Sequence, residues 1–146
     1  MDRSVAHPDH LSYRVKRLYL LFAQRIDDGL KPYSIGRSQY QVLSRVARAG
    51  TLTQKDLQQT LQIESATLTC IVDALVAKGW LERLESAEDK RVRVLLLTDD
   101  GRDKLVRIPD PYEGVESRML SGVPVEDRAT ARALLETMIL NLEDRS

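Results

Sequence analysis

TLTQKDLQQTLQIESATLTCIVDALVAKG, the stretch from Thr51 to Gly79, decides the fold of this chain. It predicts two short helices, over residues 54–61 and 65–78, joined by residues 62–64 alone. Apolar residues recur at spacings of three and four in the second helix, which is the pattern of one buried face: Leu68, Ile71, Val72 and Leu75. Two short helices with so tight a connection are typical of a helix-turn-helix.

The first of these helices has a well-marked start. Thr53 is placed to accept a hydrogen bond from the amide of Asp56, and the Asp56 carboxylate to reach back to the amide of Thr53. Leu52 and Leu57 flank this capping box at the positions of a hydrophobic staple. Ser65 is placed to cap the second helix.

After Gly79 the apolar period changes from that of a helix to that of a strand. Residues 80–84 and 92–97 are strand-like, and the polar segment 85–91 separates them. This pattern predicts a β-hairpin directly after the second helix, which is the place of a wing.

A long helix is predicted before this region, over residues 8–30. It has an apolar stripe (Leu11, Val15, Leu18, Phe22, Ile26) and a second apolar set on neighbouring faces (Tyr13, Leu20, Leu21, Ala23). A helix that is apolar on more than one side must bury those faces away from water. A partner chain could cover them, which we favour, or a wide groove of the same chain could. A loop over residues 31–36 then leads to a helix over 37–49, which Gly50 ends.

The C-terminal part is predicted to be helical with one break. Thr98 caps a helix that Pro109 and Pro111 interrupt, and helix resumes over residues 113–120. Pro124 fits the first turn of the last helix. The apolar stripe of that helix consists of Ala131, Leu134, Leu135, Met138, Ile139 and Leu142.

Composition narrows the classes of function. The 146 residues include 22 Lys and Arg and 22 Asp and Glu, so the chain has no excess of basic residues. A surface that binds nucleic acid would therefore need a local concentration of Lys and Arg. No apolar run is long enough to span a bilayer and the N-terminus lacks the apolar core of a secretory signal, so we expect the cytoplasm. A single cysteine excludes an internal disulfide framework, and no cofactor fingerprint or nucleophile–base arrangement suggests an enzyme.

The outward face of the second helix is expected to lie in the major groove of double-stranded DNA. It offers hydroxyls and methyl groups to base edges but no Arg or Lys: its residues are Ser65, Ala66, Thr67, Thr69, Cys70 and Asp73. The cations lie on the wing instead: Arg83, Lys90, Arg91 and Arg93. We expect Asp89 to brace an arginine while Arg91 points into a minor groove. Gln54 and Lys55 are placed to bond phosphates.

Together these elements predict a mainly α fold with a small β-hairpin wing, a winged helix-turn-helix flanked by dimerisation helices. The expected divisions are an N-terminal dimerisation helix and loop over residues 1–36, a DNA-binding winged helix-turn-helix over 37–98, and C-terminal dimerisation helices over 99–146. The long apolar helices would supply a homodimer, and the homodimer two recognition helices.

Several motifs resemble the multiple antibiotic resistance regulator (MarR) family of transcriptional regulators. They are residues 51–57 (TLTQKDL), 67–69 (TLT), 72–75 (VDAL), 79–80 (GW), 89–91 (DKR) and 97–101 (LTDDG). The acid-x-Arg motif of the wing, followed by Leu-Thr-x-x-Gly, is fairly specific in this context. The flanking long helices match the family's architecture as well, so the resemblance extends over nearly the whole chain.

The resemblance implies a homodimer that binds a pseudo-palindromic operator and represses or activates nearby genes, commonly until a small phenolic or other lipophilic ligand binds. Arg91 matches the wing arginine that enters the minor groove, and Asp89 its supporting acid. Ser65, Thr67 and Thr69 match groove-facing positions. Many members have Arg where this chain has Cys70, so its base readout is expected to differ.

A pocket for the effector is expected around Tyr13, Arg17 and Tyr40. An aromatic wall with one cation suits a carboxylated or phenolic aromatic molecule. The alternative is that both tyrosines belong to the core and that Arg17 is an ordinary surface residue.

Three other hypotheses stand beside this one. Oxidation of Cys70 would make a redox-sensing regulator, but we favour a buried or idle thiol. His7, Asp9 and His10 are too few and too close to the terminus for a metal site, so none is expected. A winged helix used only for protein contacts would also suit the neutral charge.

Overall fold

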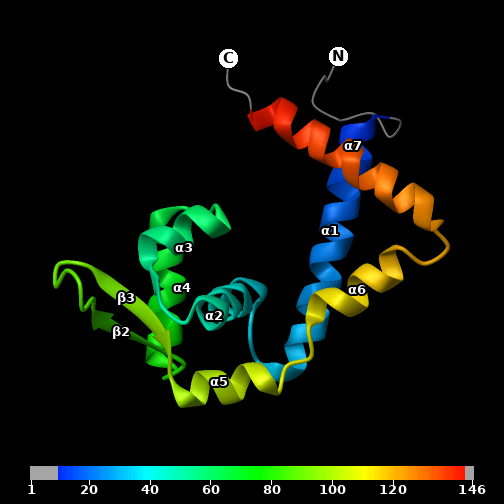
Figure 1. The fold of residues 1–146 in the computed structure, drawn as a ribbon. Coiled ribbons are helices and arrows are strands. Elements are labelled where there is room, and N and C mark those ends of the chain that lie inside the picture. Colours follow the sequence, from blue (N-terminus) through cyan, green and yellow to red (C-terminus); the bar gives the residue numbers. More distant parts are fainter. Residues whose placement is uncertain (1–9, 144–146) are drawn as a thin grey trace, which may run out of the picture. The chain divides into compact units, whose positions relative to one another are not determined.

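The computed structural model describes residues 10–143, which are mainly helical, as predicted (Figure 1). The first elements are α1 (Leu11–Leu30), the 3-10 turn η1 (Lys31–Tyr33) and α2 (Arg37–Ala49). The winged region consists of β1 (Leu52–Thr53), α3 (Gln54–Leu61), α4 (Ser65–Ala77), β2 (Leu81–Glu85) and β3 (Arg93–Leu97). The remaining elements are α5 (Asp99–Val106), α6 (Pro111–Met119) and α7 (Val125–Glu143). Residues up to Pro111 form one unit, and residues from Tyr112 onward form a second.

The predicted hairpin of the wing is present, and a third short strand joins it. The antiparallel sheet has the order β1-β3-β2, with Leu52 opposite Leu95 and Thr53 opposite Val94. A strand of two residues has no alternation pattern, so the sequence could not indicate β1. Because β1 directly precedes α3, it joins the start of the helix-turn-helix to the wing.

One apolar core holds the winged region together. It is formed by side chains from α2, α3, α4 and the sheet that are at most 2% exposed: Val42, Leu43, Val46, Leu57, Leu68, Val72, Leu75, Leu81 and Leu95. Each such side chain contributes about 1.5–3 kcal/mol relative to an exposed one. No polar or charged side chain among residues 10–143 is buried, so the polar groups of the candidate interface all lie at or near the surface.

Only the C-terminal part of α1 belongs to this core. Ala23, Ile26 and Leu30 are buried, whereas every residue from Leu11 to Leu21 is exposed. The described residues of α7 likewise include no buried one. The apolar side chains predicted on the N-terminal part of α1, from Leu11 to Leu21, and most of those predicted on α7 are therefore open to solvent in the single chain.

Three local predictions are corrected by the structure. Pro111 is the first residue of α6, which therefore starts before residue 113; proline is tolerated there because that amide has no helical partner. Pro124 precedes α7, and its carbonyl accepts from the amides of Asp127 and Arg128, both at 3.1 Å. Ser65 does not cap α4, because it is the first helical residue and the cap position is Glu64.

The predicted capping box of α3 is confirmed in its first half. The amide of Asp56 donates to the Thr53 hydroxyl at 3.0 Å. The Asp56 carboxylate accepts from that same hydroxyl at 2.6 Å instead of from the Thr53 amide. Aspartate is one methylene shorter than the usual Glu of this motif, so its carboxylate reaches the nearer group.

Trp80 joins the end of α4 to the start of α5. The ammonium groups of Lys78 and Lys104 each lie 4.7 Å from the centre of its ring. Its carbonyl accepts from the amide of Thr98 at 3.2 Å. The Thr98 hydroxyl accepts from the amide of Gly101 at 3.0 Å, which confirms Thr98 as the cap of α5. Gly101 is thereby held directly against the Trp80 backbone.

A side chain at residue 101 would not fit this junction. A Cβ there would lie 2.1 Å from the carbonyl oxygen of Trp80, which is backbone and cannot rotate away. We expect Gly101→Ala to lower the free energy of unfolding by about 2 kcal/mol or more, measured by denaturant titration.

Gly29→Ala is the matched control, because Gly29 lies in α1 and a Cβ added there would have no atom within 4 Å. That change should leave stability the same or raise it by up to about 1 kcal/mol, since alanine favours the helix. Equal stability of Gly101→Ala and the wild type would contradict the close approach.

Candidate nucleic-acid interface

The predicted helix-turn-helix is formed by α3 and α4, which bend by 118° at the turn between them. Gln62 ends α3 with a left-handed backbone (φ 52°), which allows the tight reversal. The angle lies within the roughly 90–120° typical of this motif. Among the described helices none is by itself long and apolar enough to span a membrane; α3 and α4 meet the criteria of length and composition only together, as this bent pair.

The recognition helix α4 has a buried and an exposed face. Leu68, Val72 and Leu75 are 0% exposed, which turns the opposite face outward. The predicted groove-facing residues all lie there, with Thr69 half-buried and the others exposed: Ser65, Ala66, Thr67, Cys70 and Asp73. The face is polar and carries no Lys or Arg, so Asp73 is the one charged residue within α4.

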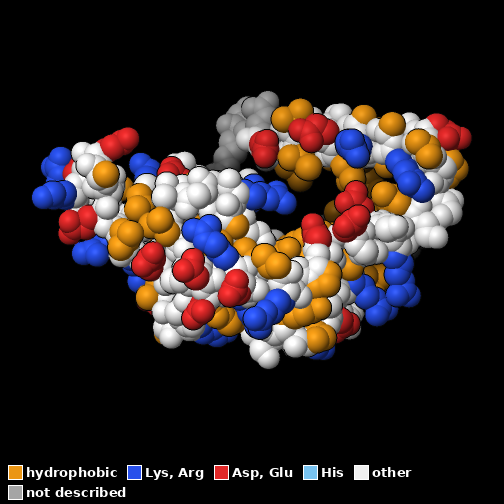
Figure 2. All heavy atoms as spheres, turned by 60° about the horizontal axis from the view of Figure 1, so that its bottom comes forward, with side chains coloured by type: hydrophobic (Ala, Val, Ile, Leu, Met, Phe, Trp, Pro, Cys, Tyr) orange, Lys and Arg blue, Asp and Glu red, His pale blue; other side chains and the backbone are white. Residues whose placement is uncertain are grey.

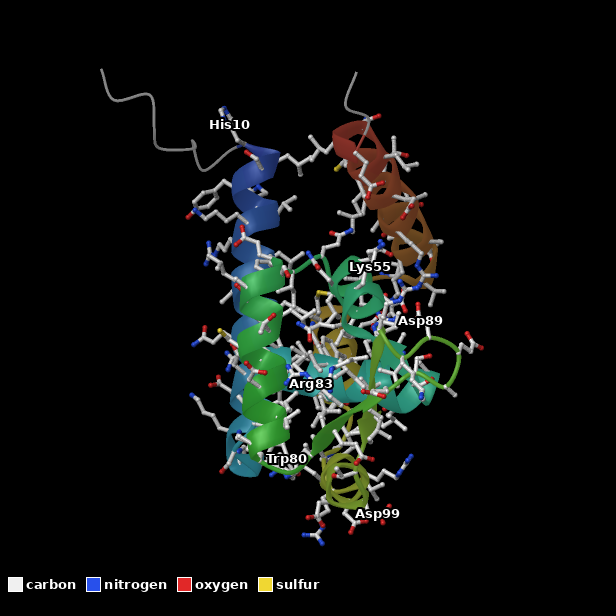
Figure 3. The ribbon with its side chains drawn as sticks, turned by 90° about the vertical axis from the view of Figure 1, so that its left-hand side faces the viewer. His10, Lys55, Trp80, Arg83, Asp89 and Asp99 are labelled. Atoms are coloured by element: carbon white, nitrogen blue, oxygen red, sulfur yellow. The ribbon has the colours of Figure 1, made fainter. Side chains whose placement is uncertain are left out.

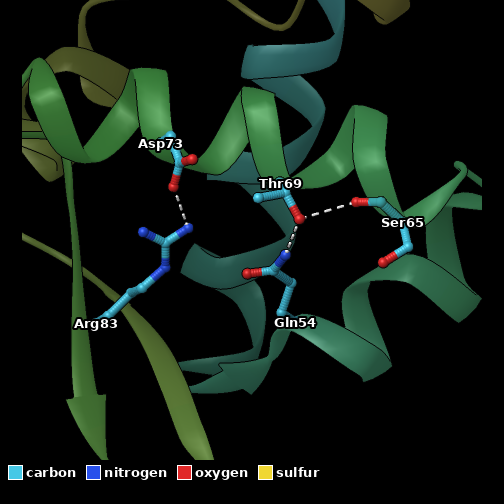
Figure 4. A network of polar contacts seen from close by, with 5 residues as sticks. All are labelled: Gln54, Ser65, Thr69, Asp73 and Arg83. Carbon is cyan, nitrogen blue, oxygen red and sulfur yellow. Dashed lines mark hydrogen bonds and ion pairs between the residues drawn. The ribbon is translucent and has the colours of Figure 1, made fainter.

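Thr69 joins α4 to the start of α3. Its hydroxyl accepts a hydrogen bond from Nε2 of Gln54 at 2.8 Å and donates to the carbonyl of Ser65 at 2.9 Å (Figure 4). The amide nitrogen of Gln54, predicted to bond a phosphate, is therefore engaged within the protein. The proton of the Thr69 hydroxyl is engaged as well.

A second contact joins α4 to the wing. The guanidinium of Arg83, on β2, lies 2.5 Å from the carboxylate of Asp73 (Figure 4). Both residues were predicted at the interface, but their ion pair was not. The sequence did contain a signal for this ion pair, because Asp73 is the single charged residue of α4 and the basic residue Arg83 follows in the next strand.

The wing loop between β2 and β3 presents Arg91 to solvent. The Asp89 carboxylate accepts from the backbone amide of Arg91 at 2.9 Å and lies 3.3 Å from its Nε. The Arg91 side chain is nevertheless 91% exposed. An ion pair so exposed contributes about 0–1 kcal/mol, so the arginine can exchange this partner for another anion at little cost. The expected bracing of an outward arginine by Asp89 is thus present.

The other predicted cations lie in the same region. Lys55 is exposed in the first turn of α3, and Lys90 and Arg93 are exposed on the wing. Figure 3 shows Lys55 on α3 and Asp89 on the hairpin. Cations and carboxylates are mixed at the protruding end of the wing (Figure 2). Net positive potential there depends on which cations are free and which are paired.

Cys70 is a free and exposed thiol on the outer face of α4. The exposure agrees with the predicted outward position of Cys70, and of the two expected states, a buried or an idle thiol, the buried one is wrong. Its side chain points away from Leu68 and Val72 because the helical period places it between the exposed positions Thr67 and Asp73.

The three predicted effector residues lie in different surroundings. Tyr13 and Arg17 lie one turn apart on the exposed part of α1, whereas Tyr40 lies on α2 and is buried, with 9% of its surface exposed. Tyr13 and Arg17 are thus open to a ligand, and Tyr40 belongs to the core.

A groove of about 550 Å³ lies elsewhere, between β1, the start of α3 and the wing. Its lining includes the apolar side chains of Leu84, Val94 and Leu96 and four acidic residues: Asp56, Glu85, Glu88 and Asp89. These acids would repel an anionic ligand. None of the three predicted effector residues lines this groove.

An outward second helix followed by an arginine-bearing hairpin defines the winged helix-turn-helix class of DNA-binding proteins. The profile of the MarR family matches residues 35–92, and the chain belongs to this family. It is 29% identical over 115 residues to the multiple antibiotic resistance protein MarR of Salmonella typhimurium, which covers 78% of this chain and 80% of that protein. It is 30% identical over 110 residues to the uncharacterized HTH-type transcriptional regulator YdgJ of Bacillus subtilis, covering 75% of this chain and 67% of the relative.

Solved structures agree with this assignment. A cysteine-to-serine mutant of MarR from E. coli, crystallised with operator DNA, has a TM-score of 0.80 and 25% identity, and the match covers 88% of this chain and 92% of that one. The chain is therefore a DNA-binding transcriptional regulator of a non-enzymatic family. This assignment decides against a winged helix used only for protein contacts.

Proposed function

We propose that this chain is a homodimeric repressor that binds a pseudo-palindromic operator and is released by a small aromatic or lipophilic ligand. The observation that carries the proposal is that each chain presents one outward α4 face together with the exposed Arg91 of the wing loop. One such unit reads one half-site, and a two-fold dimer reads two half-sites roughly 34 Å apart.

Unpaired apolar surface supports the dimer. On α1, Leu18 is 50% and Tyr19 61% exposed; on α7, Leu134 is 53% and Leu140 55% exposed. Large apolar side chains left exposed along a helix in this way are typical of protein interfaces. The dimerisation segments of the proposal are residues 1–36 and 99–146, with residues 37–98 as the DNA-binding domain.

Separate roles follow for the polar residues of the interface. The exposed residues of α4 approach base edges in the major groove, Arg91 enters the adjacent minor groove with Asp89 as its support, and Lys55 and Lys90 contact phosphates. Because α4 offers no cation, most of the electrostatic attraction comes from the wing and the start of α3.

The dimer is tested by sedimentation at micromolar concentration. We expect the wild type to sediment as a dimer and Leu18→Glu to sediment as a monomer with an operator affinity at least about ten-fold lower, because one half-site is lost. Leu84→Glu is the matched control for sedimentation and should remain a dimer, since Leu84 is 46% exposed but lies on the wing, away from α1. A monomeric wild type would overturn the proposal.

The wing is tested on an operator fragment selected from genomic DNA. Arg91→Ala should weaken operator binding about ten-fold more than Thr69→Ala does. It should also reduce the steepness of log affinity against log salt by about one, because one cation that neutralises the phosphate charge is lost. Thr69 is the comparison because its hydroxyl is already bonded within the protein. The reverse order of the two variants would refute the role of Arg91.

The effector is tested with a panel of aromatic carboxylates and phenols. At least one should lower operator affinity in the wild type, and Arg17→Gln should abolish that response without changing ligand-free DNA binding, because the ligand loses its cation. Tyr13→Phe serves as the control that retains the ring. Operator affinity that no compound of the panel alters would count against the effector.

A further inference from the structure

Asp73 is in an unfavourable place for a DNA-binding helix. It is the one charged residue within α4, on the outward face, and its side chain is 58% exposed. In the proposed complex that carboxylate faces the major groove and its bordering phosphates. An unpaired carboxylate there would repel phosphates that lie within the Debye length of roughly 8–10 Å, and this repulsion would lower the affinity for DNA.

Arg83 neutralises the charge of Asp73. It pairs with Leu95 across the sheet, and Leu95 is 1% exposed, so Arg83 points toward the core side of β2, where α4 packs. Its guanidinium lies 2.5 Å from the Asp73 carboxylate, and the Arg83 side chain is only 27% exposed. A charge held in this way is not available to a phosphate, in contrast to Arg91 at 91% exposure.

Thr69 and Asp73 lie one turn apart on α4, and both are held from outside the helix. Gln54 of α3 donates to the Thr69 hydroxyl on one side, and Arg83 of β2 pairs with Asp73 on the other. Residues four apart share a helix face, so the two contacts hold the same face from the preceding helix and from the wing. They fix how α4 is turned relative to Arg91.

We propose that Arg83 is a positioning residue rather than a phosphate contact: it neutralises Asp73 and fixes α4 to the wing, and Gln54 acts with it through Thr69. The inference rests on the proposed operator binding. It replaces the sequence-based expectation that Arg83 and Gln54 touch DNA. Removing Arg83 alone leaves an unpaired carboxylate on the interface, whereas removing both charges leaves none.

The test is a double-mutant cycle on the selected operator fragment. Arg83→Ala should weaken binding at least about ten-fold, because it exposes the unpaired carboxylate. Asp73→Asn alone should stay within about three-fold of the wild type. The double variant should recover to within about three-fold of the wild type, with an unchanged salt slope, since the repulsion is removed and no phosphate contact was lost. The remaining loss, up to about three-fold, measures the contact that fixes α4 to the wing.

Glu64→Gln in the Arg83→Ala background is the matched control. Glu64 is an exposed carboxylate at the start of α4, so its removal changes net charge equally without touching the ion pair. Recovery with Asp73→Asn but not with Glu64→Gln supports the proposal. Equal recovery with both substitutions would overturn the proposal in favour of a general charge effect. No recovery with either, together with a salt dependence less steep by about one, would overturn it in favour of a direct contact between Arg83 and a phosphate.

Thermal unfolding of every variant separates positioning from folding. The midpoint of Arg83→Ala should stay close to that of the wild type, and if that variant does not fold, Arg83→Gln takes its place in the cycle. Failure of the wild type to bind any duplex fragment would contradict the proposed function itself. Wild-type binding without recovery in the double variant would contradict only the role of Arg83.

Discussion

The burial of one face of α4 governs how the protein can meet DNA. Leu68, Val72 and Leu75 are fully withdrawn from solvent, and the helix packs there against α2 and β2. A helix whose one face is buried must turn the other outward, so the same contacts that stabilise the domain also present Thr67 and Asp73. The wing shares this core through Leu81, and helix and wing are therefore presented together.

Charge is distributed unevenly around this packing. The chain has equal numbers of basic and acidic residues, and α4 has no cation to offer a phosphate. Attraction to DNA thus depends on which wing cations are free. Arg83 is held by Asp73 while Arg91 is almost fully exposed, so two arginines of one hairpin take different parts in binding.

Signals that act over a few residues could be predicted well. The sequence indicated the bounds of α2 and α3, the cap at Thr98 and a hairpin within one residue of its observed strands. The contact between Asp89 and Arg91 spans two residues and could also be anticipated. Helix ends, caps and turns are decided by neighbouring side chains and backbone groups, which is why the sequence alone contains them.

The sequence by itself therefore determined the helix-turn-helix, the wing and the outward residues of α4, because periodicity assigns each residue to a face. Only the tertiary structure decided which polar residues of that surface are free. The Gln54–Thr69 and Asp73–Arg83 contacts join residues 15 and 10 positions apart on different elements. Such pairs form only where the core sets the distance between helix and strand, and no local pattern encodes that distance.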